Sequence, residues 1–255
     1  MFNFTTTDFT IIDGTITGLT TSGENKIQAT SGVIDSFPAG ITAIDNNAFN
    51  CSAVTGIGSW GDVETVGDYA FAHARLSRLP DSWGKVACTG HSAFGNNQIT
   101  SLPDSWGDVE VVGVMAFFSN LLSCLPDSWG KITRVPECAF GYNRIPCVPD
   151  SWGDIEVIGV DAFCGNRLSR LPDNWGKVTE IGDGAFAYNI LSCLPDSWGD
   201  IRVIGDEAFF ANTPNPSGSK KLSNSDYLVT NINPVPDTRG VEYVGEDIFG
   251  MDQLI

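Results

Sequence analysis

Every tryptophan in this 255-residue chain lies 23 residues after the previous one. The seven are Trp60, Trp83, Trp106, Trp129, Trp152, Trp175 and Trp198. No single helix or strand produces so long a period. It is typical of a solenoid, in which one short supersecondary unit is stacked on copies of itself. The repeat therefore predicts one solenoid rather than the one or two globular domains that chain length alone suggests.

The repeat has the consensus L-S-x-L-P-D-S-W-G-x-V-x-x-I-G-x-x-A-F-x-x-N-x, and we place its copies in residues 33–212. Its apolar positions form columns, which predicts a continuous core and one parallel strand per repeat. Leu-Pro ends an extended segment because proline cannot donate to a sheet ladder. Pro-Asp-Ser favours a turn, and Gly-x-x-Ala-Phe-x-x-Asn indicates a short turn or helix on the outer side.

The two ends of the chain differ from the repeats. Residues 1–32 are rich in threonine and alternate in polarity, and Asp13-Gly14 is a hairpin signal, so we predict an N-terminal capping hairpin. Residues 213–240 break the period and are predicted to form an inserted loop. Residues 241–255 contain VEYVGEDIF, which indicates a degenerate C-terminal capping repeat.

The motif N-x-L-S-x-L-P-x-S-W resembles leucine-rich repeats, and I-G-x-x-A-F resembles their BspA-like, Treponema-type subclass. This resemblance implies a right-handed leucine-rich-repeat stack with one parallel sheet, capped at both ends. The chain departs from the subclass in two respects. It has asparagine where BspA-like units usually have cysteine, and its proline comes two residues earlier, which leaves open which segment supplies the main strand. A parallel β-helix is the alternative fold.

The resemblance implies a non-enzymatic binding or adhesion scaffold of bacteria or some parasites, which recognises a protein or a glycan through variable repeat positions. Two alternatives stay open: a structural component of a virion or surface assembly, and a carbohydrate-active β-helix enzyme. The sequence contains no glycine-rich phosphate motif and no G-x-S-x-G elbow. Cys88 and His91 have ligand-like spacing, but no second pair accompanies them. We therefore predict no catalytic residue, no cofactor and no metal.

The net charge and the hydropathy of the chain limit the kinds of partner that we expect it to bind. A formal net charge of −17 argues against binding to nucleic acid, which needs clustered lysine and arginine. No apolar run is long enough to insert into a membrane. The start of the chain lacks the pattern of a signal peptide. We expect a cytoplasmic or virion-associated protein, or a secreted or cell-surface one if the chain is a mature form. The oligomeric state stays open.

The seven cysteines are odd in number and irregularly placed, which favours free thiols over a disulfide framework. Three of them, Cys124, Cys147 and Cys193, share one repeat position, so Cys124 and Cys147 are the pair that stacking would bring within reach. The same column also holds Arg78, Ser101 and Arg170.

Because that column varies, Arg78, Ser101 and Arg170 are candidate binding residues. Lys220, Lys221 and Tyr227 in the predicted insertion are the others. We interpret the tryptophans as core residues, although an exposed platform for sugars is the competing interpretation. A second structural column is predicted to satisfy backbone groups at the turn; it contains Asn97, Asn120, Asn143, Asn166 and Asn189.

Two further columns carry charge. The aspartates of Pro-Asp-Ser are interpreted as turn or capping residues rather than calcium ligands, because calcium needs six to eight oxygens. The residue two places after each tryptophan alternates in sign, and its members are Asp62, Lys85, Asp108, Lys131, Asp154, Lys177 and Asp200. This alternation predicts that each lysine is flanked by an aspartate on both sides, which avoids the repulsion of stacked like charges.

Overall fold

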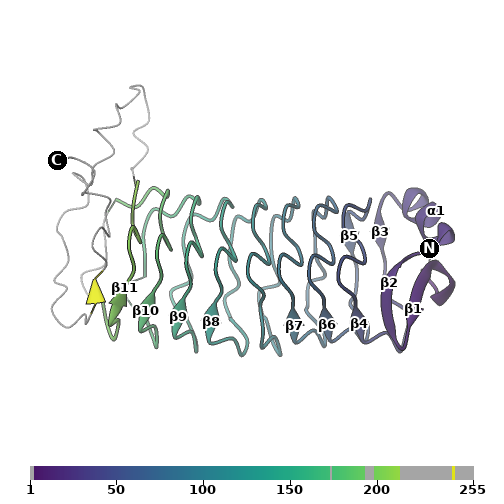
Figure 1. The fold of residues 1–255 in the computed structure, drawn as a ribbon, viewed down its shortest axis with the longest axis horizontal. Coiled ribbons are helices and arrows are strands. Elements are labelled where there is room, and N and C mark those ends of the chain that lie inside the picture. The colour runs from purple at the N-terminus through teal and green to yellow at the C-terminus, as the bar shows by residue number, and fades with distance from the viewer. Residues whose placement is uncertain (1–2, 173, 193–197, 213–242, 245–255) are drawn as a thin grey trace, which may run out of the picture. The chain divides into compact units, whose positions relative to one another are not determined.

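A computed structural model describes residues 3–172, 174–192, 198–212 and 243–244 of the chain. Its residues divide into two compact units, Met1–Ile132 and Thr133–Ile255, and each is described by itself. In both units the chain winds in coils of about one repeat, and short parallel strands join successive coils (Figure 1). The predicted solenoid class is therefore confirmed.

The first unit begins with the 3₁₀ helix η1 (Thr6–Asp8) and the hairpin β1 (Phe9–Ile12) and β2 (Thr15–Leu19). The helix α1 follows at Thr21–Ala29. The coil strands are β3 (Val33–Ile34), β4 (Ala43–Ile44), β5 (Gly56–Ile57), β6 (Thr65–Val66) and β7 (Cys88–Thr89). The parallel set β2, β4, β6 and β7 forms one sheet with β1, and β3 pairs with β5.

The second unit contains β8 (Arg134–Val135), β9 (Val157–Ile158), β10 (Glu180–Ile181), β11 (Val203–Ile204) and β12 (Tyr243–Val244). They form one parallel sheet in chain order, and each residue pairs with its equivalent one coil away. These strands consist of the two residues that precede the glycine position of I-G-x-x-A-F, which Pro136 occupies after β8. The segment N-x-L-S-x-L-P forms a different ladder, described below.

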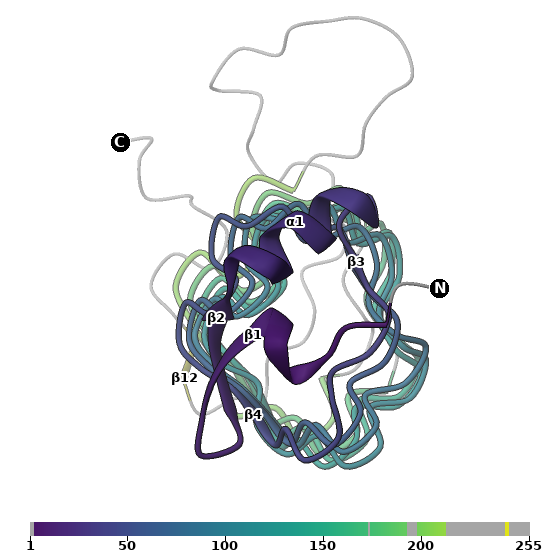
Figure 2. The ribbon, with the colours of Figure 1, turned by 90° about the vertical axis from the view of Figure 1, so that its right-hand side faces the viewer.

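The N-terminal end of the first unit contains a hairpin and a helix. Strand β1 runs antiparallel to β2, and the turn between them is Asp13-Gly14, whose φ angles are +48° and +76°. Helix α1 follows directly and lies across the end of the coil (Figure 2). The side chain of Thr20 caps it by accepting a hydrogen bond from the Gly23 amide at 3.2 Å. The hairpin was predicted from the sequence, but this helix was not.

A buried ion pair ties η1 to α1. Asp8 is 2% exposed, and its carboxylate accepts a hydrogen bond from Lys26 Nζ at 2.7 Å. Ser22 and the Thr5 amide also donate to this carboxylate. Burial raises the pKa of Asp8, but the hydrogen bonds from Lys26, Thr5 and Ser22 together outweigh burial and lower the pKa to about 2. The carboxylate is therefore the stabilising form.

This pair predicts a pH-dependent loss of stability in the variant Asp8→Asn. A carboxyl group whose pKa falls from 3.8 to about 2 on folding contributes about 2 kcal/mol above pH 4. That contribution disappears as the pH falls towards 2. Urea unfolding should show the full difference between the two proteins at pH 6 and almost none near pH 2. The exposed Asp13→Asn is the control, and a difference for Asp8→Asn that does not change with pH contradicts the prediction.

Two aromatic columns fill the core. All seven tryptophans are at most 6% exposed, and every repeat phenylalanine from Phe49 to Phe209 is at most 1% exposed. Equivalent rings stack on one another: the centroids of Trp60 and Trp83 are 5.9 Å apart, and those of Phe71 and Phe94 are 5.7 Å apart. Burial of an indole removes about 150–250 Å² from water. The structure thus places the indoles in the core rather than on a sugar platform.

Two glycine positions of the repeat consensus have a steric reason. The glycine after tryptophan has a positive φ, for example +59° at Gly84, and its amide donates to Ser82 Oγ at 3.0 Å. The glycine of I-G-x-x-A-F lies against the preceding coil. At Gly67 a Cβ atom would stand 2.5 Å from Asn46 Oδ1 and 2.7 Å from the Asn46 amide nitrogen. A side chain there would push the coils apart.

Trp83→Ala should destabilise the first unit by about 3–5 kcal/mol, because the cavity has packed rings on every side. Denaturant unfolding measures this loss, and tryptophan emission with acrylamide quenching measures the burial of the remaining indoles. Tyr69→Ala is the matched control, since Tyr69 is an aromatic residue that is 41% exposed. Equal losses for the two variants, or ready quenching of the native protein, would disprove the role given to the column.

Candidate functional site

The segment N-x-L-S-x-L-P forms a hydrogen-bonded ladder on one side of the coils. In the first unit the Gln98 amide donates to the Leu76 carbonyl at 2.7 Å, and the Leu121 amide donates to the Ile99 carbonyl at 3.0 Å. In the second unit Arg167 N–H donates to the Ile145 carbonyl at 3.0 Å. The leucine or isoleucine of each segment points into the core and its neighbours point outward. We call the outward residues of segments 75–78, 98–101, 121–124, 144–147, 167–170 and 190–192 the ladder face.

The ladder face varies from coil to coil. In the first unit its first column reads Arg75, Gln98 and Leu121, and another column reads Arg78, Ser101 and Cys124. In the second unit Arg144 and Arg167 occupy the first column in neighbouring coils, and both are exposed. The predicted binding residues Arg78, Ser101 and Arg170 all lie on this face and are exposed. The predicted residues Lys220, Lys221 and Tyr227, and the inserted loop itself, lie outside the described residues.

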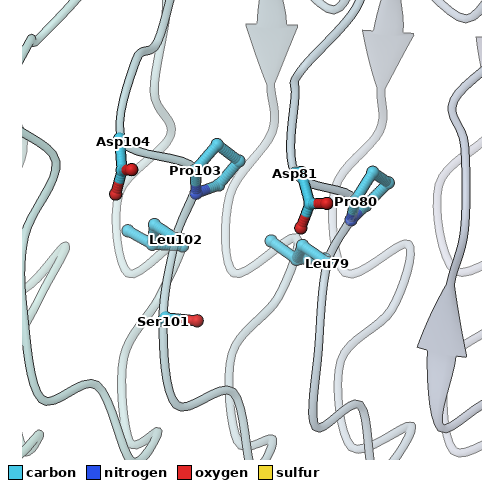
Figure 3. A pocket seen from close by; sticks show the side chains of 7 residues that line it. All are labelled: Leu79, Pro80, Asp81, Ser101, Leu102, Pro103 and Asp104. Atoms are coloured by element: carbon cyan, nitrogen blue, oxygen red, sulfur yellow. The ribbon is translucent and has the colours of Figure 1, made fainter.

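A groove borders the ladder face in the first unit. It has a volume of about 230 Å³ and lies between the Leu-Pro-Asp turns of two successive coils (Figure 3). Its lining residues are Leu79, Pro80, Asp81, Ser101, Leu102, Pro103 and Asp104. The leucines and prolines are buried, and both aspartates are exposed. Ser101 is the only one of these residues that was predicted from the sequence to bind a ligand. The repeat columns were considered one at a time, whereas the groove combines residues of different columns from two coils.

The aspartates of the groove do not cap the turn. In the part of the chain that the structure describes, neither the Asp81 nor the Asp104 side chain forms a hydrogen bond or an ion pair. The serine that follows does this instead, since Ser82 Oγ accepts from Gly84 and Ser105 Oγ accepts from Gly107. The capping role that the sequence suggested for the aspartates is therefore wrong at these two coils.

The alternating charge column forms one-sided pairs. Lys85 Nζ lies 2.8 Å from Asp62 Oδ1, Lys131 lies 2.9 Å from Asp108, and Lys177 lies 2.6 Å from Asp154. The register places Lys85 between the coils of Asp62 and Asp108, as predicted, but its only ion pair among the described residues is with the preceding coil. One ammonium held at hydrogen-bond distance by one coil cannot equally reach the next coil, about 4.8 Å further on. These exposed pairs contribute little stability.

The asparagine column binds neighbouring coils together. Asn97 Oδ1 accepts from the Leu76 amide of the preceding coil at 2.8 Å. Its Nδ2 donates to the Phe71 carbonyl of that coil at 2.7 Å and to its own Phe94 carbonyl at 3.0 Å. Asn120, Asn166, Asn189 and Asn212 make the equivalent bonds within their units. Because the amide is buried and its hydrogen bonds are all internal, this column is a structural element.

Asn97→Asp tests this arrangement. The carboxylate keeps the acceptor but loses both donor hydrogens and faces carbonyl oxygens, so we expect a loss of about 2–4 kcal/mol at pH 7. Burial and these carbonyls should raise the pKa of the new carboxyl group, so the loss should shrink as the pH falls to 4. Denaturant unfolding at both pH values measures it. Asn96→Asp is the control because the adjacent Asn96 is exposed. A loss that is equal at the two pH values contradicts the prediction.

The two buried thiols, Cys138 and Cys164, are not activated as nucleophiles. The six described cysteines, Cys51, Cys88, Cys124, Cys138, Cys147 and Cys164, are free. Burial raises the pKa of the Cys138 thiol to about 11 and that of Cys164 to about 12, and the Asp161 carboxyl adds to both shifts. Both groups are thus neutral at pH 7, and a neutral thiol is a poor nucleophile.

A second exposed surface lies on the turns around the phenylalanine column. The residue two places after each phenylalanine has a φ near +55°, which is costly for a residue with a side chain. Tyr142 and Tyr188 occupy this position in the second unit and are 57% and 55% exposed. The backbone of the turn is nonetheless held by the next coil, as when Tyr142 N–H donates to the Cys164 carbonyl at 2.7 Å. We call these exposed residues the turn face.

Metal-binding clusters and membrane-spanning helices are two features that the described residues lack. Within the described ranges, no three histidine, cysteine, aspartate or glutamate side chains lie together so that they could hold a metal ion. No described helix has the length and apolar character needed to cross a membrane.

Comparison with known families adds to this picture. Residues 15–100 match the family model of the BspA type leucine-rich repeat region, in six copies. The chain is similar to BspA-type leucine-rich-repeat proteins. This agrees with the coil length, the leucine ladder and the buried Ala-Phe turn described above. No curated protein matches the chain.

Two solved structures are similar. One is the pneumococcal vaccine antigen PcpA, with a TM-score of 0.46 and 19% identity over 82% of this chain and 58% of that one. The other is a leucine-rich repeat protein from Bacteroides ovatus, with a TM-score of 0.47 and 16% identity over 84% of this chain and 51% of that one. The chain spans less than two thirds of the length of either protein.

Proposed function

We propose that the protein is a non-enzymatic binding scaffold that recognises a protein or a glycan through its ladder face. The observation that carries this proposal is the contrast within each ladder segment. The inward residue is always leucine or isoleucine and is buried, whereas the outward residues change in size and charge from coil to coil. The fold places no demand on side chains that point into water, so this variation is available for recognition.

The ladder also holds these variable positions rigidly. Within each unit, neighbouring segments are hydrogen-bonded along their backbones, so their outward side chains have a fixed spacing. Binding surfaces built on such ladders lose little entropy when a ligand is bound. Similarity to BspA-type repeats supports the same function, and adhesion at a bacterial surface is the corresponding biological proposal. The I-G-x-x-A-F motif supports the Treponema-type subclass within it.

A pair of arginines shows what the second unit offers to a ligand. Arg144 and Arg167 occupy the same column in neighbouring coils, are exposed, and form no ion pair among the described residues. Stacked like charges are unfavourable for folding. In a chain with 31 acidic and 14 basic residues, carboxylates that could neutralise them are abundant elsewhere. The pair therefore favours a ligand with negative charge at this part of the face.

Arrays of glycans and of purified proteins, probed with the folded chain, will identify ligands, and two variants then locate the contact. Arg144→Glu with Arg167→Glu changes the ladder face, and Tyr142→Ser with Tyr188→Ser changes the turn face of the same unit. Both variants should keep the melting temperature of the native protein because all four side chains are exposed.

We expect the ladder-face variant to lose about tenfold or more in affinity and the turn-face variant to bind normally. The opposite result would move the binding surface to the turns. If no array member binds but a reducing sugar is released from an acidic polysaccharide, the scaffold proposal is replaced by the carbohydrate-active enzyme.

A further inference from the structure

The groove of the first unit has the composition of a site for a long cationic side chain. Its walls are two leucines and two prolines, and its rim carries the exposed carboxylates of Asp81 and Asp104. Figure 3 shows the two Leu-Pro-Asp triplets side by side, one coil apart. An aliphatic stem packs well on such apolar walls while its charged end stays at the rim. The walls and the rim are thus complementary to the two parts of an arginine side chain.

The second unit shows this contact within its own chain. Arg170 lies one coil after Asp150, and its guanidinium Nη1 is 3.6 Å from Asp150 Oδ1. Three repeats earlier, the residues at these two positions are Ser101 and Asp81. The same backbone position therefore carries an arginine whose guanidinium approaches the aspartate in one unit, with both side chains exposed, and a serine in the other. The groove lies where the arginine is missing.

We propose that this groove binds an arginine side chain from a basic segment of another protein. The guanidinium takes the place that Arg170 occupies beside Asp150, and it pairs with Asp81 and Asp104. A charge-assisted contact of this kind provides a partner for two exposed carboxylates that have none among the described residues. The inference deepens the proposed function and rests on it, because Ser101 belongs to the ladder face as well as to the groove.

The negative charge of the groove favours an arginine side chain over the other possible occupants. A second copy of the chain brings a net charge of −17, which repels an acidic groove. A divalent cation would need more oxygen ligands than two carboxylates supply, and no described group of side chains forms a metal site. A basic polypeptide satisfies both the apolar walls and the rim.

The test is an NMR titration of the full chain with a blocked peptide, acetyl-Gly-Gly-Arg-Gly-Gly-amide. The control peptide replaces arginine with citrulline, which has nearly the same shape but no charge. We expect the arginine peptide to shift the amides of residues 79–81 and 101–104, and the citrulline peptide to leave them unchanged. The shifts should weaken severalfold between about 20 mM and 200 mM salt. Equal shifts from both peptides overturn the proposal.

Variants complete the test. Ser101→Arg supplies the missing side chain and should abolish peptide binding, whereas Ser169→Arg makes the same charge change on the second unit and should leave it intact. Asp81→Asn with Asp104→Asn should also abolish binding, and its control is Asp13→Asn with Asp200→Asn. Arg170→Ser should create a new response at Asp150. Peptide binding that survives Ser101→Arg in a folded protein refutes the groove as the site.

The groove and the ladder face can fail separately. If the peptide does not bind but Arg144→Glu with Arg167→Glu still removes an array ligand, only the groove proposal is wrong. If that variant keeps its array ligand while the peptide shifts residues 79–81, the groove stands and the wider ladder face is not the contact surface.

Discussion

Each coil depends on its neighbours for the hydrogen bonds of its own backbone. The ladder segments and the residue after each strand donate to the preceding coil, as in Gly90 to Val66 at 2.8 Å, whereas the phenylalanine turns donate to the following coil, as in Phe71 to Ala93 at 2.8 Å. The buried asparagine amide joins these two systems, because it contacts a turn carbonyl and a ladder amide of the preceding coil. A coil without neighbours would lose these hydrogen bonds and expose its apolar side chains to water, which explains why such a unit is stable only in a stack.

The aromatic columns follow from the same constraint. Coils that bond edge to edge bring equivalent side chains close together, so a tryptophan in one coil is covered by a tryptophan in the next. This is why the 23-residue period was sufficient to predict the solenoid, the buried indoles and the bonding role of the asparagines. A repeated sequence shows directly which positions the fold needs, since only those positions keep their residue type in every coil. The glycine after each tryptophan belongs to this set, and the residue before the tryptophan accepts a hydrogen bond from it, as Ser82 does from Gly84 and Asn174 does from Gly176.

Features that depend on geometry between coils were not accessible from the sequence. Helix α1 begins in a threonine-rich stretch and contains Gly23, whose low helix propensity conceals it. The sequence shows that lysines and aspartates alternate in the charge column. It does not show whether a lysine side chain turns towards the preceding or the following coil, so the preference of Lys85 for the preceding coil could not be predicted. The groove was missed for a related reason. It joins Ser101 to Asp81, which are 20 residues apart and belong to different columns, and only the backbone path makes them neighbours.

The aspartates show how a repeat separates structural from functional positions. A residue that recurs in every coil is normally assigned to the framework, yet the Asp81 and Asp104 carboxylates bond to nothing in the described structure while the adjacent serine caps the turn. Their stacking is unfavourable, so the fold itself gives no reason to keep them. What differs between coils is the neighbour: the Arg170 guanidinium lies 3.6 Å from the Asp150 carboxylate in the second unit, whereas Ser101 stands at that position beside Asp81 in the first. A column of aspartates thus lies beside a column whose residue changes from coil to coil, and that residue approaches the aspartate of the preceding coil at Arg170 but not at Ser101. Under the groove proposal, this difference determines which coils can accept a side chain of another protein.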